Sequence, residues 1–110
     1  MSFIIKHPLI GNIEVYKNDT TVPMSWNNAV RACNELGEGW RLPTKKELEI
    51  IFDELHNQDR GDFKDETYWS CSEYDTDCSR GLNFDRARAH RPYYGDKSGI
   101  LHVRAVRTLP

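Results

Sequence analysis

One segment of the sequence gathers the side chains that most often make binding contacts. Between Asp85 and Lys97 the chain reads DRARAHRPYYGDK, with three arginines and two adjacent tyrosines. From Arg80 to Lys97 there are five lysine or arginine residues and two aspartates, although the whole chain carries a formal net charge of -2. Tyrosine and arginine join a large contact area to directional hydrogen bonds, so we predict a ligand-binding loop over residues 85–97. Its predicted contact residues, with Tyr74 added from the neighbouring turn, are Arg86, Arg88, His90, Arg91, Tyr93, Tyr94 and Asp96.

A plainer interpretation of this segment stays open. Its arginines could lie on a solvated hairpin and offset acidic residues such as Glu35, Glu38 and Asp65. Surface ion pairs of that kind contribute little to stability and often have no specific role. Asp75 and Asp77, in the preceding turn, could join the binding face, but acidic residues are common in turns.

The remaining reactive side chains form no pattern that catalysis or metal binding requires. Calcium needs clustered oxygen ligands, and an Asp-x-Asp pair in one turn is a weak signal for it. Zinc sites combine histidine and cysteine at short, regular spacings, which the four histidines and three cysteines of this chain lack. We also find no nucleophile with a base and an orienting residue. We therefore expect a protein that is not an enzyme and that needs no metal or cofactor.

Length and composition predict a single domain. A chain of 110 residues suits one hydrophobic core, so we expect one domain over residues 1–110. The net charge of -2 argues against nucleic acid as a partner, since such binders carry a basic excess. No apolar run approaches the roughly 20 residues that span a bilayer, and the first residues are too polar for a signal peptide. We therefore expect no membrane insertion and a cytoplasmic location as encoded, with association with a virion or host cell as an open alternative.

The three cysteines cannot all pair within one chain. Cys71 and Cys78 flank a predicted turn, and the sequence leaves open whether they form a disulfide. Cys33 shares one face of a predicted helix with Trp26 and Val30, so we expect it to be buried. Free thiols in a reducing compartment are the simplest account of all three.

Two helices are predicted in the first half of the chain, after one or two strands in the loosely alternating residues 3–18. Ser25 is placed to cap a helix that ends near Gly37. Thr44 and Glu47 form the Thr-x-x-Glu capping box that begins the second helix. The apolar stripe of that helix, at positions i, i+3, i+4 and i+7, consists of Leu48, Ile51, Phe52 and Leu55.

The second half of the chain predicts a sheet. Residues 57–66 are expected to form a polar surface loop, anchored in the core by Phe63. Strand character returns at residues 68–72 and again near residues 81–84, with turn-forming residues between them. Residues 100–107 alternate between apolar and polar and predict a last strand. Two helices followed by a mostly antiparallel sheet indicate an α+β fold.

Several ordered motifs resemble one known family. The chain contains GWRLPT at residues 39–44, GDFKDETYWS at residues 61–70 and VRAVR at residues 103–107. These motifs are similar to those of the bacterial and phage family named for the C-terminal domain of the Legionella collagen-like protein, over residues 10–107. The resemblance implies a C-type-lectin-like fold, with two helices packed on a mostly antiparallel twisted sheet and long loops in the second half.

The same motifs supply residues that we expect to build the scaffold. Trp40 and Trp69 are large anchors, and Arg41 could hold a carboxylate or backbone carbonyls between helix and sheet. The resemblance suggests that many members join the first helix to the last strand by a disulfide, where this chain has Cys33 and Ala105. Without the second cysteine, Cys33 is expected to pack against Ala105. The full predicted scaffold set is Trp26, Cys33, Trp40, Arg41, Pro43, Trp69, Arg104 and Ala105.

These features predict a non-catalytic ligand- or receptor-binding module of bacterial or phage origin, which binds a protein or glycan through residues 85–97. The resemblance supports this placement, because lectin-like folds usually project their binding loops between the middle strands and the last one. Two alternatives stay open. One is an intracellular, phage-encoded accessory protein that inhibits a host factor or captures an anionic small molecule. The other is a subunit of a surface or virion assembly, which would form a stable homo-oligomer with an exposed apolar patch.

Overall fold

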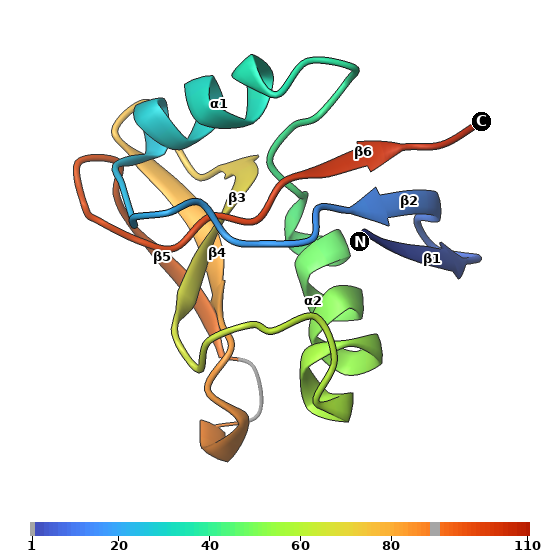
Figure 1. Cartoon of the computed structure of the whole chain (residues 1–110). Coiled ribbons are helices and arrows are strands. Elements are labelled where there is room, and N and C mark those ends of the chain that lie inside the picture. Colours follow the sequence, from blue (N-terminus) through green and yellow to red (C-terminus); the bar gives the residue numbers. More distant parts are fainter. Residues whose placement is uncertain (1, 89–90) are drawn as a thin grey trace.

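The computed structural model describes residues 2–88 and 91–110, and this part of the chain contains two α-helices and two three-stranded antiparallel sheets. The helices are α1 (Trp26–Glu35) and α2 (Lys45–Glu54). Helix α1 lies across the top of the molecule and α2 stands below it, between the sheets (Figure 1). The α+β fold class predicted from the sequence is thereby confirmed.

The first sheet joins the two ends of the chain. It consists of β1 (Phe3–His7), β2 (Gly11–Val15) and β6 (Val106–Thr108), in the order β1-β2-β6. The β1–β2 hairpin turns over residues 8–10, and Gly11, which begins β2, has a φ of 75°, which favours glycine. The N-terminus and the C-terminus therefore both lie at this sheet, on the right-hand side of Figure 1.

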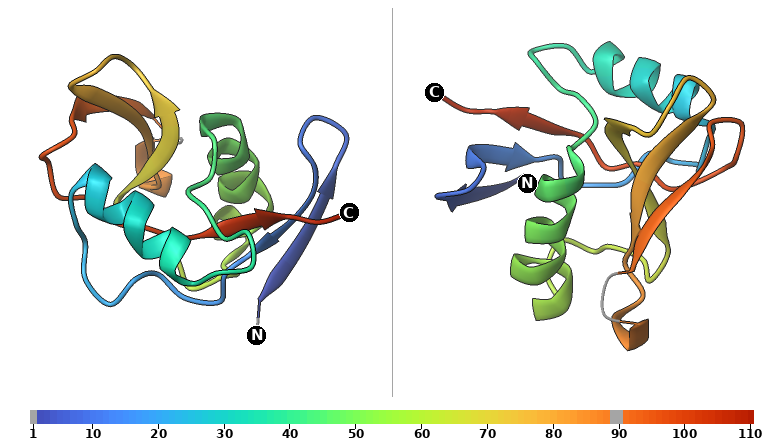
Figure 2. Two further views of the ribbon diagram at one scale, coloured as in Figure 1. Left: turned by 90° about the horizontal axis from the view of Figure 1, so that it is seen from above. Right: turned by 180° about the vertical axis from the view of Figure 1, so that it is seen from behind.

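The second sheet consists of β3 (Thr67–Glu73), β4 (Cys78–Asn83) and β5 (Pro92–Asp96). The central strand β4 pairs antiparallel with both neighbours, and the register of β3 against it shifts between Trp69 and Glu73. Seen from above and from behind, this sheet stands across from the first one, with α2 between them (Figure 2). The segment predicted as a polar loop over residues 57–66 connects α2 to this sheet, and its first residues belong to a short 3-10 helix, η1 (His56–Gln58).

Both helices begin where the sequence predicts. Ser25 occupies the N-cap position of α1, although its side chain makes no capping hydrogen bond. Gly37, with a φ of 75°, follows the end of this helix, and its N–H donates to the Asn34 carbonyl (3.0 Å). The capping box of α2 is confirmed: the Thr44 hydroxyl accepts from the Glu47 N–H (3.1 Å), and the Glu47 carboxylate accepts from the Thr44 N–H (2.8 Å).

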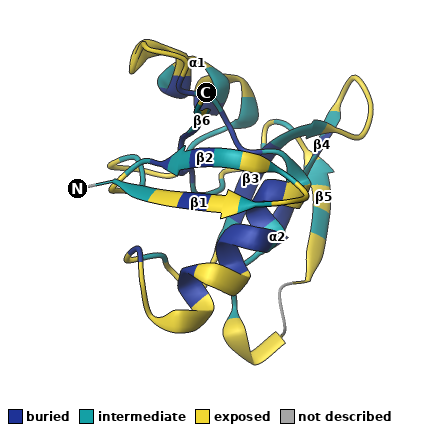
Figure 3. Ribbon diagram, turned by 90° about the vertical axis from the view of Figure 1, so that its right-hand side faces the viewer, coloured by how far each residue is buried: buried dark blue, intermediate teal, exposed yellow. Residues whose placement is uncertain are grey.

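Two buried clusters form the core. The larger one gathers side chains of the first sheet and α2 with Tyr68, Leu82 and Phe84, and Figure 3 shows the buried face of α2 beneath β1 and β2. The smaller one lies under α1 and contains Trp69. Strand β3 separates the two clusters, because the adjacent side chains of Tyr68 and Trp69 point to opposite faces and both are 0% exposed.

The predicted last strand is wrong over most of its length. The sequence predicts a strand over residues 100–107, whereas β6 begins only at Val106. Residues 103–106 are all buried, so the chain does not alternate between core and water there. Arg104 is the reason, because its side chain turns inward and finds four partners inside the protein. It donates to the Asp19 carboxylate (2.8 Å) and to the carbonyls of Tyr16 (3.1 Å), Gly61 (2.8 Å) and Asp62 (3.3 Å).

Candidate ligand-binding surface

Residues 85–97 do not form one loop, so this part of the sequence-based prediction is wrong. They form a short 3-10 turn, η2 (Arg86–Arg88), and then the strand β5. Asp85 closes the turn, because its carbonyl accepts from the Arg88 N–H (2.9 Å). Further on, the β-forming pair Tyr93 and Tyr94 extends the sheet beside β4. His90, a predicted contact residue, lies outside the residues that the structure describes.

Tyr93 takes part in the packing of the sheet. Trp69 on β3, Gly81 on β4 and Tyr93 on β5 form one row across the three strands. The Tyr93 ring meets Trp69 edge to face, with 6.3 Å between the ring centroids. A Cβ atom at Gly95 would lie 2.3 Å from the Tyr93 hydroxyl oxygen. Gly95 thus makes room for this half-buried ring.

Tyr94 points to the opposite face of β5, where it stacks on Tyr74. The two rings are nearly parallel, at 18°, with their centroids 4.7 Å apart. Arg80 lies opposite Tyr94 in the β4–β5 pair, and its guanidinium carbon is 5.2 Å from the centroid of the Tyr74 ring. Tyr74 is 51% exposed and Tyr94 is 63% exposed. We call Tyr74, Arg80 and Tyr94 the aromatic surface.

The aromatic surface begins where the larger core ends. Arg80 lies two residues before Leu82 on β4, so the two side chains share one face of the sheet. Leu82 is fully buried against side chains of α2, whereas the stacked tyrosines one row further along remain open to water. Sequence reasoning counted Arg80 only as part of a basic segment. The available signal was its position between the small residues Ser79 and Gly81, which places it on the face opposite to theirs.

Arg86 is held by acidic side chains at the other end of the sheet. Its guanidinium pairs with Asp59 and donates to the Asp65 carboxylate (3.2 Å). The hydrogen bonds from Arg86 and from His56 hold the pKa of Asp65 below its usual value. The arginine is thus offset by acidic residues, as the plainer interpretation of this segment predicts. The His56 ring, which approaches Asp65 to 2.6 Å, is buried among Phe52, Phe63 and Phe84.

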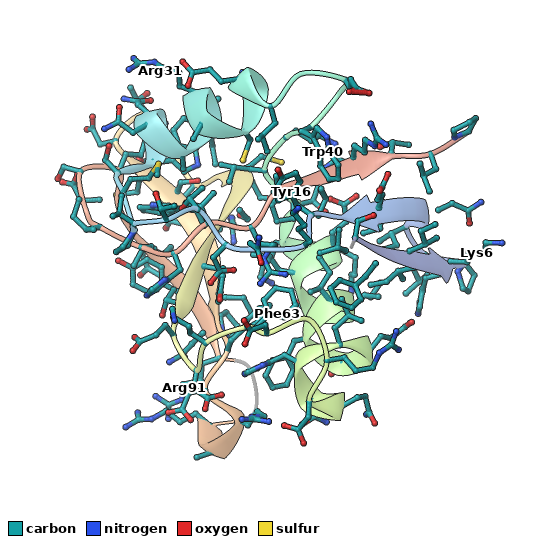
Figure 4. All side chains as sticks on the ribbon, viewed as in Figure 1. Lys6, Tyr16, Arg31, Trp40, Phe63 and Arg91 are labelled. Atoms are coloured by element: carbon teal, nitrogen blue, oxygen red, sulfur yellow. The ribbon has the colours of Figure 1, made fainter. Side chains whose placement is uncertain are left out.

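The other predicted polar contacts lie at opposite ends of β5. Arg88 is exposed, and its Nε atom is 3.5 Å from the Asp85 carboxylate. Arg91 is exposed beside η2, and Figure 4 shows it at the lower edge of the molecule, far below α1. At the upper end, the Asp96 carboxylate accepts from the N–H and the hydroxyl of Ser98, both at 2.8 Å, which lowers its pKa. The predicted contact residues are therefore spread along the sheet and do not meet at one loop tip.

Lys97 fixes the upper end of the sheet against α1. Its Nζ atom lies 4.4 Å from the centroid of the Trp26 ring. The same ammonium group donates to the Glu73 carboxylate (3.1 Å) and to the Thr76 carbonyl (3.0 Å). The Trp26 indole N–H in turn donates to the Ser70 carbonyl (2.8 Å). These contacts hold in place the β3–β4 hairpin that carries most of the aromatic surface.

The predicted scaffold residues are buried or hydrogen-bonded. Trp69 donates its indole N–H to the Met24 carbonyl (2.9 Å). Arg41 binds the Glu47 carboxylate through two hydrogen bonds, of 2.8 and 2.9 Å, and also donates to the Leu42 carbonyl (3.1 Å). Burial alone would raise the pKa of Glu47, but the bonds from Arg41 and from the backbone outweigh it and lower the pKa.

The thiols of all three cysteines are free. Cys33 is 1% exposed and shares the smaller core with Ala105 and Trp40, and burial raises the pKa of its thiol to about 12. Trp40 meets Tyr16 edge to face at 5.0 Å, close to the middle of Figure 4. The Cys71 N–H donates to the carbonyl of the buried Pro43 (2.8 Å), which ties β3 to the start of α2.

Within residues 2–88 and 91–110, no group of three or more histidine, cysteine, aspartate or glutamate side chains could hold a metal ion. Over the same residues, no helix is long and apolar enough to cross a membrane. Every buried side-chain nitrogen or oxygen of the described residues has a hydrogen-bond partner. No unpaired buried polar atom therefore marks a polar site inside this part of the protein.

Most of the sequence matches one protein family. No curated protein matches the chain. The family model for the Lcl C-terminal domain matches residues 11–107, which run from the start of β2 into β6. The match includes the aromatic surface and every predicted scaffold residue. The chain therefore belongs to the Lcl C-terminal domain family.

Proposed function

We propose that this protein is a non-catalytic binding module of bacterial or phage origin, whose aromatic surface contacts a protein or glycan ligand. The observation that carries the proposal is the stacked pair of Tyr74 and Tyr94, which stays largely exposed beside Arg80. Membership of the Lcl C-terminal domain family supports a binding role in a bacterial protein. The C-type-lectin-like fold that the resemblance implies would suit the same role.

The aromatic surface suits binding because its shape is set before a ligand arrives. Tyr94 lies on a paired strand, and the hairpin that carries Tyr74 is fixed by Lys97. Rigid aromatic side chains offer a large contact area and lose little conformational entropy when a ligand binds. Arg80 adds hydrogen-bond donors next to a flat apolar ring.

A protein or glycan fits this chemistry better than a small anion does. An anion needs several cations that converge on it, whereas Arg86 is already paired with Asp59 and Asp65. Exposed aromatic rings can instead lie flat against apolar side chains or against the C–H face of a sugar. The neighbouring guanidinium of Arg80 can then donate to hydroxyl or carbonyl groups of the ligand. The alternative of an accessory protein that captures an anionic small molecule therefore has less support.

A second candidate, a subunit of a surface or virion assembly, is favoured by β1. This strand forms an edge of the first sheet, and its Ile4 is 61% exposed, while Leu9, in the turn that follows, is 69% exposed. Edge strands with exposed apolar side chains pair readily with other chains. Sedimentation of the native chain and of an Ile4→Lys variant tests this candidate, which requires an oligomer that the substitution dissociates.

The proposed function is tested by removing the stacked pair. The native chain and a Tyr74→Ala/Tyr94→Ala variant are compared on a glycan array and in capture from bacterial envelope extract. A Val22→Ala variant is the matched control, because it removes an exposed apolar side chain that lies outside both sheets. We expect the native chain and the control to retain a ligand that the tyrosine variant loses. A ligand that the tyrosine variant retains would exclude the aromatic surface as the binding site.

A further inference from the structure

A cavity lies under α1, in a part of the molecule that the proposed function does not use. It has a volume of about 280 Å³ and lies between α1 and the segment that links β2 to α1. Ala32, Cys33 and Leu36 form its wall on the α1 side, Ala105 lies on the side of the core, and Tyr16 with residues 18–21 forms the opposite wall. The aromatic surface lies on the second sheet and supplies none of these residues.

The cavity exists because small side chains meet there. Ala32 and Cys33 present a methyl group and a thiol where larger residues would fill the space. Ala105 is 4% exposed and Cys33 is 1% exposed, so these two form the inner end of the cavity. Leu36, which is 40% exposed, borders its opening. The resulting surface is apolar along α1.

The opposite wall cannot simply close over this space, because the protein holds it from behind. The Tyr16 N–H donates to the Ala105 carbonyl (2.9 Å), and the Thr20 N–H donates to the Val103 carbonyl (3.0 Å). The Asp19 carboxylate accepts from the buried Arg104 guanidinium at 2.8 Å. Backbone and ion-pair contacts thus fix the segment at both ends and in the middle, and the cavity is formed before any ligand binds.

The charges around the cavity favour a neutral ligand. Its described lining residues include no lysine, arginine or histidine. Asp19 is the acidic residue among them, and its carboxylate is already neutralised by Arg104. An anion would therefore find no cation among these residues and would approach a carboxylate. The exposed side chains of Asn18 and Thr21 offer an amide and a hydroxyl group for hydrogen bonds.

We propose that this cavity binds a small neutral molecule that has an apolar ring and one hydrogen-bonding group. A dry cavity of about 150 Å³ holds benzene, so a cavity of about 280 Å³ has room for a ring with a short polar substituent. The ring lies against Ala32, Cys33 and Leu36, and the polar group reaches Asn18 or Thr21. This site is independent of the aromatic surface, so either proposal can fail without the other.

Nuclear magnetic resonance titrations of the isotope-labelled full chain test the proposal with two probes. Benzyl alcohol and benzoate carry the same ring, but only the first is neutral. We expect benzyl alcohol to cause saturable shifts of amide signals in residues 16–21 and 32–36, and we expect benzoate to cause none. Equal effects of both probes, shifts that do not saturate, or shifts confined to other residues would overturn the proposal.

A pair of variants locates the binding site. Ala32→Leu fills the cavity with a good helix former, and Asn34→Leu adds the same side chain at an exposed position of the same helix. We expect the first variant to weaken benzyl alcohol binding by at least about tenfold and the second to change it by less than about twofold. Unchanged binding to a folded Ala32→Leu variant contradicts the proposal. If that variant does not fold, the comparison of benzyl alcohol with benzoate on the native chain still tests the proposal.

Discussion

Tyr93 and Tyr94 are neighbours in the sequence, yet they belong to opposite faces of one sheet. Tyr93 meets Trp69 edge to face and helps to close the smaller core. Tyr94 stacks on Tyr74 beyond the edge of the larger core and stays 63% exposed. The two side chains have the same chemistry, so their place in the strand register decides which of them a ligand can reach. A segment rich in tyrosine thus offers only the rings that packing does not use.

The largest effect is expected on the buried side of this comparison, at Trp69. Its ring is 0% exposed, and its indole N–H donates to the Met24 carbonyl. Trp69→Ala removes that bond and opens a cavity in the smaller core, which should lower the free energy of unfolding by about 3–5 kcal/mol. Urea denaturation measures the change. A loss of under about 1 kcal/mol would mean that the core collapses around the gap, and the contrast between the two faces would then be weaker than we infer.

Gly81 tests how closely β3 and β4 approach each other between the two faces of the sheet. A Cβ atom there would lie 2.4 Å from the Tyr68 carbonyl oxygen, so Gly81→Ala must push two paired strands apart. We expect a loss of about 1–3 kcal/mol in the free energy of unfolding. Gly95→Ala is the matched control, because its new Cβ atom meets the hydroxyl end of the movable Tyr93 side chain. The control should cost less, and the opposite order would contradict the packing described for this row.

A pH titration extends the comparison to charged residues. Glu47 is 5% exposed, and its hydrogen bonds from Arg41 and the backbone hold its pKa below the usual 4.5. Since the folded pKa is lower than the unfolded one, the ionised carboxylate stabilises the fold fully above pH 4.5, and this contribution is lost as pH falls through the folded pKa. Glu47→Gln should therefore cost about 1–3 kcal/mol at neutral pH and less in acid. Thermal unfolding of both proteins from neutral to acidic pH measures this. A difference in stability between the two proteins that does not change with pH would show that ionisation of Glu47 does not stabilise the fold.

The smallest effect on stability is expected at the aromatic surface itself. Tyr94→Ala should change the free energy of unfolding by less than about 0.5 kcal/mol, because the ring packs only on other exposed groups. Tyr93→Ala, one residue away, should cost about 1–2 kcal/mol, because a half-buried ring leaves Trp69. Urea denaturation of both variants compares them directly. Equal losses of stability in the two variants would mean that Tyr93 packs no more tightly than Tyr94.

The sequence predicts the local features of this fold well. The capping box of Thr44 and Glu47 and the end of α1 at Gly37 depend on residues within a few positions of each other, and both lie where the sequence places them. Two strands begin the chain, as the alternation in residues 3–18 indicates. The chemistry of Arg41 also follows from its motif, because its carboxylate partner lies six residues further along the chain.

Features that depend on distant partners could not be predicted in the same way. Arg104 interrupts the last strand because Asp19, 85 residues earlier, draws it into the protein. The aromatic surface depends on the pairing of β4 with β5, which the sequence-based prediction of a loop over residues 85–97 did not include. That pairing puts Tyr93 and Tyr94 on opposite faces and brings Arg80 beside Tyr94. Composition therefore identified Tyr74 and Tyr94 as contact residues but did not identify Arg80 or the stacking that joins the three.

The first sheet contains both ends of the chain, and the aromatic surface lies on the second sheet, on the other side of α2 (Figures 1 and 2). Attachment through either terminus, to a bead, a tag or a larger carrier, therefore leaves the second sheet at the distal end of the module. A carrier at either end is joined through the first sheet, which supplies no residue of the aromatic surface. The topology thus puts the point of attachment and the aromatic surface on different sheets.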